Sequence, residues 1–281
     1  MKKQKGFTPH HFSLKNSEGF TLIELLVVFA LISLLAAIIL VALRGTGERA
    51  EIAKSLQFEA QIHHALGAYA VGIWNFREGP GNNITRDESG NGNDGTINGA
   101  TWTQKGDTPS KEGYALEFNG SSDYVSLTAE VLLSLSKNHS GSVWVYPETT
   151  GTYSTVIGNT IKSNDRFSVA ERGGLIVIGH YDGTQIFKKS GSANMDFWNH
   201  VAWSFDTATL RLWIDGVEQT GTQNPAHGWR VGFRIGSTTV DNFYFKGLID
   251  DVRIYSESLT QAQVKKLYAE GARKRGLLAG N

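Results

Sequence analysis

The stretch from Asp87 to Asp94, DESGNGND, has the residue types best suited to holding a metal ion. Oxygen-bearing side chains alternate there with glycines, which would let a loop curl around a hard cation such as Ca²⁺. A complete calcium loop of the helix–loop–helix type would also need a bidentate glutamate at its twelfth position, where this chain has Asn98. Two interpretations therefore stay open: a calcium-binding loop, or an Asx-rich turn without a metal.

Patterns that would indicate catalysis are missing from the sequence. Glycoside hydrolysis needs two carboxylates that face one cleft, about 5 to 9.5 Å apart. Asp250 and Asp251 are adjacent, so an extended strand would turn them to opposite faces. The chain also has no G-x-S-x-G, no H-E-x-x-H and no phosphate-binding loop. We therefore predict a protein that is not an enzyme.

The composition limits the partners of the protein. The 27 Lys and Arg residues balance the 27 Asp and Glu residues, which gives a formal net charge of zero. Recognition of a nucleic-acid backbone needs a surplus of cations, so we predict no nucleic-acid partner. The absence of cysteine excludes disulfides and thiolate zinc sites.

Glu24 is the one ionisable residue in an apolar run of 24 residues from Phe20 to Leu43. As a helix this run would be about 36 Å long, enough to cross a bilayer. A carboxylate in hydrocarbon costs about 2.5 to 3.5 kcal/mol, so Glu24 needs a partner. Cleavage after Gly19 would create one, the free amine of Phe20. Glu24 could also pair with this amine of a neighbouring subunit if the helices stack with an axial offset. The plain alternative is a single-pass anchor whose glutamate reaches the membrane interface.

The residues around Gly19 resemble a known signal. Residues 1–19 carry four lysines against Glu18, a flank typical of membrane targeting, and GFTLIE follows at 19–24. This arrangement is similar to the class III signal of type IV pilins and type II secretion pseudopilins, and the resemblance covers about residues 1–70. It implies that a prepilin peptidase/N-methyltransferase cuts between Gly19 and Phe20 and methylates Phe20. It also implies a filament whose axial offset is set by Glu24.

The same resemblance implies the partners and the location. Other pilin or pseudopilin subunits would pack around the apolar helix, and the chain would be a single-pass protein of the bacterial inner membrane with its C-terminal domain periplasmic or extracellular. We expect a cleaved leader at 1–19, a membrane or filament-core helix at 20–43 and a stalk at 44–71. Apolar residues at helical spacing from 48 to 71, with charges between them, predict that the stalk is an amphipathic helix.

From Gly72 onward, short apolar stretches are broken by Gly, Asn, Asp and Ser, which indicates an antiparallel all-β domain. Ten or more strands predict a two-sheet sandwich. The strands are predicted at Ala115–Phe118, Tyr124–Leu127, Ser142–Tyr146, Thr155–Ile157, Phe167–Val169, Leu175–Ile178, His200–Phe205, Leu210–Ile214, Phe233–Ile235 and Leu248–Tyr255.

Two local patterns predict how the chain turns. Asp215-Gly216 is typical of a hairpin turn, and the strand would return at Val217-Glu218. Thr260 with Gln263 fits a capping box at the start of a short helix that closes the sandwich. The residues after this helix, 271–281, are predicted to be a solvated cationic tail.

Six phrases together resemble the LamG-like, concanavalin A-like jelly-roll superfamily over about residues 72–270. They are GIWNFREG, DESGNGNDGTINGATW, ALEFNGSSDYV, FWNHVAWSFD, LRLWIDGVE and GLIDDVRIYSESLT, in the order of the family. The resemblance implies an antiparallel β-sandwich on the N-terminal helix. It also implies that the loop can hold a structural Ca²⁺ with an acid near the last strand. The candidate ligands are Asp87, Asn91 and Asn93, with Asp250 or Asp251.

This superfamily commonly binds glycans or extracellular proteins through exposed loops. Trp144, Trp203 and Trp213 lie in apolar strands and are predicted to be core residues. Trp229 is predicted to lie in the loop 224–229, where it is either an exposed ligand contact or a plug at the sandwich edge.

The sequence therefore predicts a prepilin-like structural subunit of a type IV pilus or a type II secretion pseudopilus that displays a LamG-like domain. The alternative is a membrane-tethered adhesin that binds carbohydrate or protein.

Overall fold

The structure of the 281-residue chain is a computed structural model. Its description covers residues 21–36, 66–104, 113–127, 133–135, 138–148, 153–159, 166–181, 186–206, 209–220, 229–231, 233–238 and 243–278. The chain divides into two compact units, 1–56 and 57–281, and each is described by itself.

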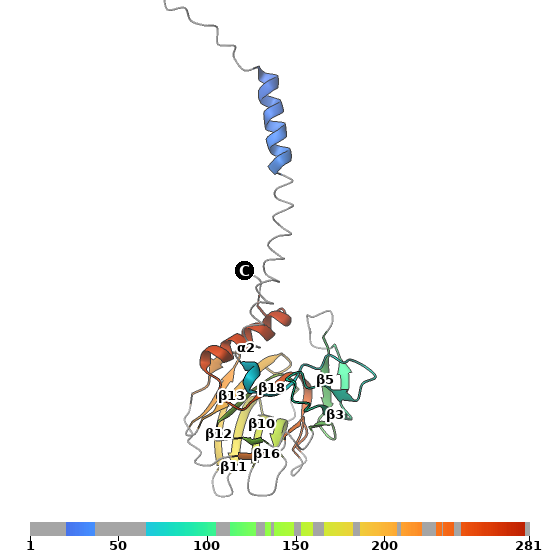
Figure 1. The fold of residues 1–281 in the computed structure, drawn as a ribbon, viewed down its shortest axis with the longest axis vertical. Coiled ribbons are helices and arrows are strands. Elements are labelled where there is room, and N and C mark those ends of the chain that lie inside the picture. Colours follow the sequence, from blue (N-terminus) through green and yellow to red (C-terminus); the bar gives the residue numbers. More distant parts are fainter. Residues whose placement is uncertain are drawn as a thin grey trace, which may run out of the picture. The chain divides into compact units, whose positions relative to one another are not determined.

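The first unit contains α1, which spans residues 22–36 and is drawn in blue in Figure 1. Its large apolar side chains are exposed on every side, from 43% at Val28 to 82% at Leu22. A helix that is apolar all round needs lipid or neighbouring helices around it. Within the described residues, no helix combines the length and the hydropathy needed to span a bilayer. The predicted helix at 20–43 includes Phe20 and residues 37–43, which lie outside the description, as do the leader and residues 44–65.

The described strands of the second unit form two large sheets and a small one (Figure 1). Sheet A has the order β15-β14-β13-β8-β18-β5-β4, with β1 also paired to β18. Its strands are β1 (Ala70–Trp74), β4 (Thr101–Thr103), β5 (Ala115–Asn119), β8 (His139–Pro147), β13 (Asn199–Phe205), β14 (Leu210–Ile214), β15 (Val217–Glu218) and β18 (Lys246–Tyr255).

Sheet B has the order β12-β11-β10-β9-β17-β6-β3-β2, and β16 pairs with β7 in the small sheet. The strands are β2 (Ile84–Thr85), β3 (Gly95–Asn98), β6 (Tyr124–Leu127), β9 (Ser154–Asn159), β10 (Arg166–Arg172), β11 (Leu175–Tyr181), β12 (Ile186–Ser192), β17 (Phe233–Ile235), β7 (Leu133–Leu135) and β16 (Trp229–Val231). The 3₁₀-helix η1 (Gly67–Tyr69) precedes β1, and α2 (Gln261–Lys274) follows β18.

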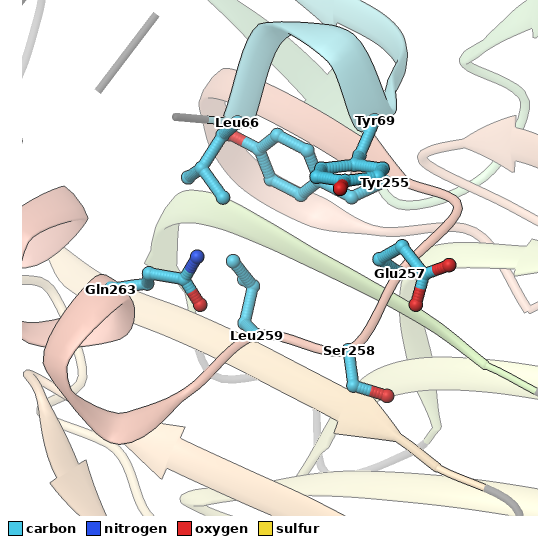
Figure 2. A pocket seen from close by; sticks show the side chains of 7 residues that line it. All are labelled: Leu66, Tyr69, Tyr255, Glu257, Ser258, Leu259 and Gln263. Atoms are coloured by element: carbon cyan, nitrogen blue, oxygen red, sulfur yellow. The ribbon is translucent and has the colours of Figure 1, made fainter. Parts of the chain in front are cut away.

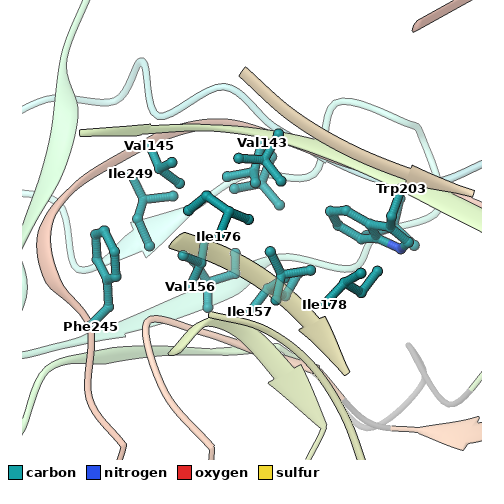
Figure 3. Close-up of a cluster of buried hydrophobic side chains, with 14 of the residues drawn as sticks. Val143, Val145, Val156, Ile157, Ile176, Ile178, Trp203, Phe245 and Ile249 are labelled. Carbon is teal, nitrogen blue, oxygen red and sulfur yellow. The ribbon is translucent and has the colours of Figure 1, made fainter. Parts of the chain in front are cut away.

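The main core lies between the two large sheets (Figure 3). Figure 3 shows Val143 and Ile249 of sheet A facing Val156 and Ile176 of sheet B, with Trp203 at one end of the cluster. This arrangement follows from the period-2 alternation of apolar residues along each strand. The described residues therefore form a two-layer antiparallel sandwich, as predicted.

The outer face of sheet A is also buried, because α2 packs on it (Figure 1). Ala202 of β13 and Trp213 of β14 belong to one buried cluster with Val264 and Leu267 of α2 and with Leu66. Burial on both faces explains why β13 is buried at all seven positions. Leu66, the first described residue of the second unit, thus packs against α2.

All ten predicted strands are present, and Tyr124–Leu127, Leu210–Ile214 and Phe233–Ile235 have the predicted ends. The hairpin turn is confirmed, since Asp215 and Gly216 both have positive φ (51° and 74°), which a type I′ turn requires. The capping box of Thr260 and Gln263 is confirmed at the start of α2.

Two predictions about where helices end are wrong. The stalk helix was predicted to reach Val71, but Ala70 and Val71 are in β1, because pairing with β18 and burial in the sandwich override their helical spacing. The cationic tail was predicted to begin at 271, but α2 continues to Lys274. The reason is that Gly271, Ala272 and Arg275 are buried against the sandwich.

Candidate functional site

Gly19 and Phe20, the predicted cleavage and methylation residues, lie outside the described residues. Glu24 is described, and it closes a capping box with Thr21. The backbone N–H and the hydroxyl of Thr21 donate to Glu24 Oε2 at 2.9 and 2.8 Å. In return, the backbone N–H of Glu24 donates to Thr21 Oγ1 at 3.3 Å. The carboxylate therefore satisfies the backbone N–H of Thr21, the residue just before α1. A new amine at Phe20 would stand one residue before this cap.

The capping role of Glu24 has a signal in the sequence that the assignment of a charge partner does not take into account. Thr21 and Glu24 match the pattern Ser/Thr-x-x-Glu that precedes an apolar helix. Its role in filament assembly stays a prediction.

The predicted metal loop is a hydrogen-bonded turn on β1. Asp87 Oδ1 accepts from the backbone N–H groups of Ile73 and Ser89 at 3.0 and 2.8 Å. Asp87 Oδ2 accepts from the Ser89 hydroxyl at 2.8 Å and from the N–H of Asn93 at 3.0 Å. Both oxygens of this carboxylate thus have two protein donors each.

The two asparagines of the loop donate to the backbone of β1. Asn91 Nδ2 reaches the carbonyls of Ala70 and Val71 at 2.8 and 3.2 Å, and Asn93 Nδ2 reaches that of Val71 at 2.7 Å. Among the described strands β1 pairs with β18 alone, so its other edge would be open. Asp87, Asn91 and Asn93, here named the Asx latch, close that edge with side chains in place of a strand.

Asp250 and Asp251, the other candidate ligands, lie at a bulge in β18. The register with β8 shifts there, and Asp251 has a φ of 52°. Ile249 and Val252, on either side, both belong to the core. The bulge therefore turns both carboxylates to the outer face of sheet A, and the prediction of opposite faces is wrong because it assumed a regular pleat.

These carboxylates belong to a buried charge network with α2. Arg253 donates to both oxygens of Asp251, at 2.9 Å from Nε and 3.2 Å from Nη2, and Nη2 also donates to Glu270 Oε1 at 2.8 Å. Lys274 Nζ donates to the same Glu270 oxygen at 2.7 Å. The side chains of Arg253 and Glu270 are each 4% exposed. Buried pairs of this kind fix geometry more than they add stability, so the network sets where α2 lies.

Arg275 holds the C-terminal end of α2. Its guanidinium carbon lies 4.3 Å from the ring centroid of Trp144 and 4.8 Å from that of Trp198, and Nη2 donates to Asp250. The predicted solvated tail is thus wrong at Arg275, whose side chain is 4% exposed.

Burial and neighbouring charges set the protonation of the network. Burial raises the pKa of Asp250 to about 6, although the charge of Arg275 opposes the shift. Burial also disfavours the charge of Asp251, but the charges of Arg253, Lys274 and Arg275 together outweigh it, and the pKa of Asp251 falls well below its usual value. Burial lowers the pKa of His200 to about 3, so this imidazole, which contacts Trp144, is neutral.

The five candidate ligands fit a calcium site poorly. The carboxylate of Asp87 has four protein donors, and Asp250 and Asp251 pair with arginines. Within the part of the chain that the structure describes, no three His, Asp or Glu side chains gather as metal ligands would. Calcium binding stays a prediction, which a titration tests.

Trp229, the candidate ligand contact, begins β16 and pairs with Leu135 of β7. The prediction that Trp229 lies in a loop is therefore wrong, because its backbone pairs with β7. Its side chain is outside the description. Trp144, Trp203 and Trp213 are buried, as predicted.

A pocket of about 210 Å³ lies between η1, the end of β18 and the start of α2 (Figure 2). Its wall comes from three segments and contains Leu66, Tyr69, Tyr255, Glu257, Ser258, Leu259 and Gln263. The Gln263 carboxamide is occupied by the capping box, and burial raises the pKa of Tyr255 to about 12. Glu257 is the one carboxylate in this lining, so the lining offers no pair of carboxylates for acid–base catalysis.

The two antiparallel sheets and the covering helix define a lectin-like jelly roll. A family model for the concanavalin A-like lectin/glucanases superfamily matches residues 119–265, and the chain belongs to this superfamily. A second model, the prokaryotic N-terminal methylation motif, matches residues 14–40. Both resemblances inferred from the sequence are confirmed. No curated protein matches the chain.

Several solved structures have a similar fold. Domain 4 of AbnA, a GH43 extracellular arabinanase from Geobacillus stearothermophilus in complex with arabinotriose, is 27% identical with a TM-score of 0.59 and covers 71% of this chain and 98% of that one. The botulinum neurotoxin serotype D binding domain is 16% identical with a TM-score of 0.59 and covers 74% and 52%. The chain spans about half of that toxin domain, and the likeness shows the fold alone.

The Asx latch predicts that Asp87→Ala lowers the stability of the second unit whether or not calcium is present. The substitution removes four hydrogen bonds to protein donors, so the free energy of unfolding should fall by about 2 to 4 kcal/mol. Thermal melts of the detergent-solubilised chain in chelator and at about 1 mM Ca²⁺ measure this. Glu88→Ala removes an exposed bond from Asn75 and is the control. A calcium-dependent rise in Tm that Asp87→Ala abolishes would instead establish the metal site.

His200 predicts a loss of stability in acid. Below pH 6.5 the unfolded chain protonates this side chain, whereas the folded chain cannot do so until about pH 3. The free energy of unfolding of the wild type, minus that of His200→Phe, should therefore fall by about 1.4 kcal/mol per pH unit below pH 6.5. Protonation of Asp250 below about pH 6 favours the folded state, but Asp250 is present in both proteins, so its contribution largely cancels in the difference between them. Urea melts from neutral to acid pH give the difference, and a flat difference would contradict the prediction.

Proposed function

We propose that the protein is a pilin-like subunit of a type IV pilus or a type II secretion pseudopilus, which displays its lectin-like sandwich outside the membrane and catalyses no reaction. The observation that carries this proposal is the methylation motif at residues 14–40, which spans Gly19, Phe20 and Glu24. The apolar side chains exposed all round α1 support it, because a filament core or a bilayer would cover them.

The capping box suggests how assembly uses Glu24. Before cleavage, its carboxylate accepts from Thr21 and holds the first turn of α1. Cleavage by the prepilin peptidase at Gly19–Phe20 adds an amine next to this carboxylate. In hydrocarbon, a carboxylate needs a cationic partner, and the amine of Phe20, from the same or a neighbouring subunit, supplies it. Pairing between subunits then fixes their axial offset.

We expect Glu24→Ala to remain in the membrane but to be depleted from sheared surface fibres by about tenfold or more, since breaking a buried charge pair is strongly destabilising. Immunoblots of the membrane and fibre fractions measure this. Glu18→Ala is the matched control, because it removes a carboxylate from the leader. An unchanged fibre yield for Glu24→Ala would contradict the proposal. So would a mature protein that mass spectrometry finds with Met1 attached and Gly19–Phe20 intact.

The second candidate function is a tethered adhesin that binds carbohydrate. The likeness to an arabinanase domain solved with arabinotriose favours it. The described surface also offers an aromatic platform: Tyr153 and Phe243 lie 5.6 Å apart, Phe243 is 38% exposed, and Arg172 stacks over Tyr153 at 4.7 Å. Sugar rings stack on such surfaces. Trp229 stays a predicted contact.

Calorimetric titration of the full chain with arabinotriose, with and without Ca²⁺, tests this second function. Binding that Phe243→Ala weakens about fivefold would support an adhesin and place its site at the platform. Phe197→Ala, which removes another exposed aromatic ring, is the control. An absence of binding to arabinotriose and to a glycan array would remove the carbohydrate function but leave the subunit role untouched.

A further inference from the structure

We propose that the solvent-facing side of α2 binds an anionic lipid surface, the membrane that holds the N-terminal helix. The contact surface, here named the α2 basic face, consists of Lys265, Lys266, Arg273, Leu277 and Leu278. The inference rests on the membrane anchoring proposed above.

The charge on the exposed side of α2 has one sign. Lys265, Lys266 and Arg273 are exposed and fall within an arc of about 100° on the helix. The one acid of α2, Glu270, points inward and binds Arg253 and Lys274. Because Glu270 is occupied inside the protein, it does not neutralise Lys265 and Lys266. Such a surface is complementary to phosphate headgroups.

Two exposed apolar side chains follow the end of the helix. Leu277 and Leu278 are 49% and 38% exposed. Cations beside exposed leucines are the composition of helices that lie in the membrane interface, where the charges meet headgroups and the apolar side chains enter the acyl boundary.

The number of residues between α1 and this face limits how far the face can lie from the membrane. Leu66, the first described residue of the second unit, shares a buried cluster with Val264 and Leu267 of α2. Residues 37–65 separate it from α1 and, even fully extended, span at most about 100 Å. A tether of this length keeps the local concentration of lipid high, so a weak contact is sufficient.

The α2 basic face is also formed in advance. Arg253 binds Glu270, and Arg275 stacks between Trp144 and Trp198, so the helix is fixed on sheet A before any lipid arrives. A surface held in place loses little conformational entropy on binding.

The test uses the full chain reconstituted in vesicles of phosphatidylcholine, with or without about 30 mol% phosphatidylglycerol. Amine acetylation followed by mass spectrometry reports the accessibility of Lys265 and Lys266. Lys246, at the start of β18 and 45% exposed in its side chain, is the internal control. We expect phosphatidylglycerol to slow the labelling of Lys265 and Lys266 about threefold or more, and about 0.5 M NaCl to reverse the effect.

A triple variant, Lys265→Gln, Lys266→Gln and Arg273→Gln, completes the test. Hydrogen exchange at Leu277 and Leu278 should slow with phosphatidylglycerol in the wild type and not in the variant. Equal labelling and equal exchange in both lipids would overturn the proposal and leave a solvated helix. Flotation of the vesicles separates the two hypotheses: a chain that fails to float contradicts the anchor, whereas one that floats without protection of Lys265 and Lys266 contradicts the lipid contact alone.

Discussion

Arg253 is buried between Asp251 of its own strand and Glu270 of α2, and the outer layer of the sandwich depends on these contacts. The arginine keeps both carboxylates ionised where burial would neutralise them, and it fixes the rotation of α2 on sheet A. Once the helix is fixed, Arg275 reaches Asp250, and Val264 and Leu267 cover the strands beneath. The helix therefore belongs to the folded unit, and its exposed side is a constant surface.

The Asx latch solves a different problem with similar chemistry. A strand at the start of a domain has a partner on one side, and its free edge would pair with other chains. Here the carboxylate of Asp87 accepts from the N–H of Ile73 on that edge, while the amides of Asn91 and Asn93 donate to its carbonyls. Asp87, Asn91 and Asn93 are the residue types that a hard cation would also select. The backbone of β1 uses the same oxygen and amide groups, so composition alone does not separate the two roles.

Local chemistry was predictable from the sequence, and long-range pairing was not. The turn at Asp215-Gly216 and the cap at Thr260 depend on a few adjacent residues, and both are where the pattern puts them. The sandwich followed from alternation and from the order of the phrases. The bulge at Asp251 depends on the register with a neighbouring strand, and the burial of Arg275 depends on two tryptophans far away in the sequence. Neither feature has a local signal in the sequence. The charged residues Asp250, Asp251 and Arg253 within an otherwise apolar strand did, however, indicate an irregularity.

The position of β1 has a mechanical consequence. β1 is the first of the described strands, and it pairs with β18, which also pairs with β5 and β8. Tension applied through the N-terminal segment would pass from β1 to β18, which lies in the middle of sheet A, and not to a strand at the edge of the sheet. Four antiparallel residue pairs and the side chains along the opposite edge would share the force. A pulling force on the anchored end would thus have to break the contacts on both edges of β1 before the sandwich could unfold.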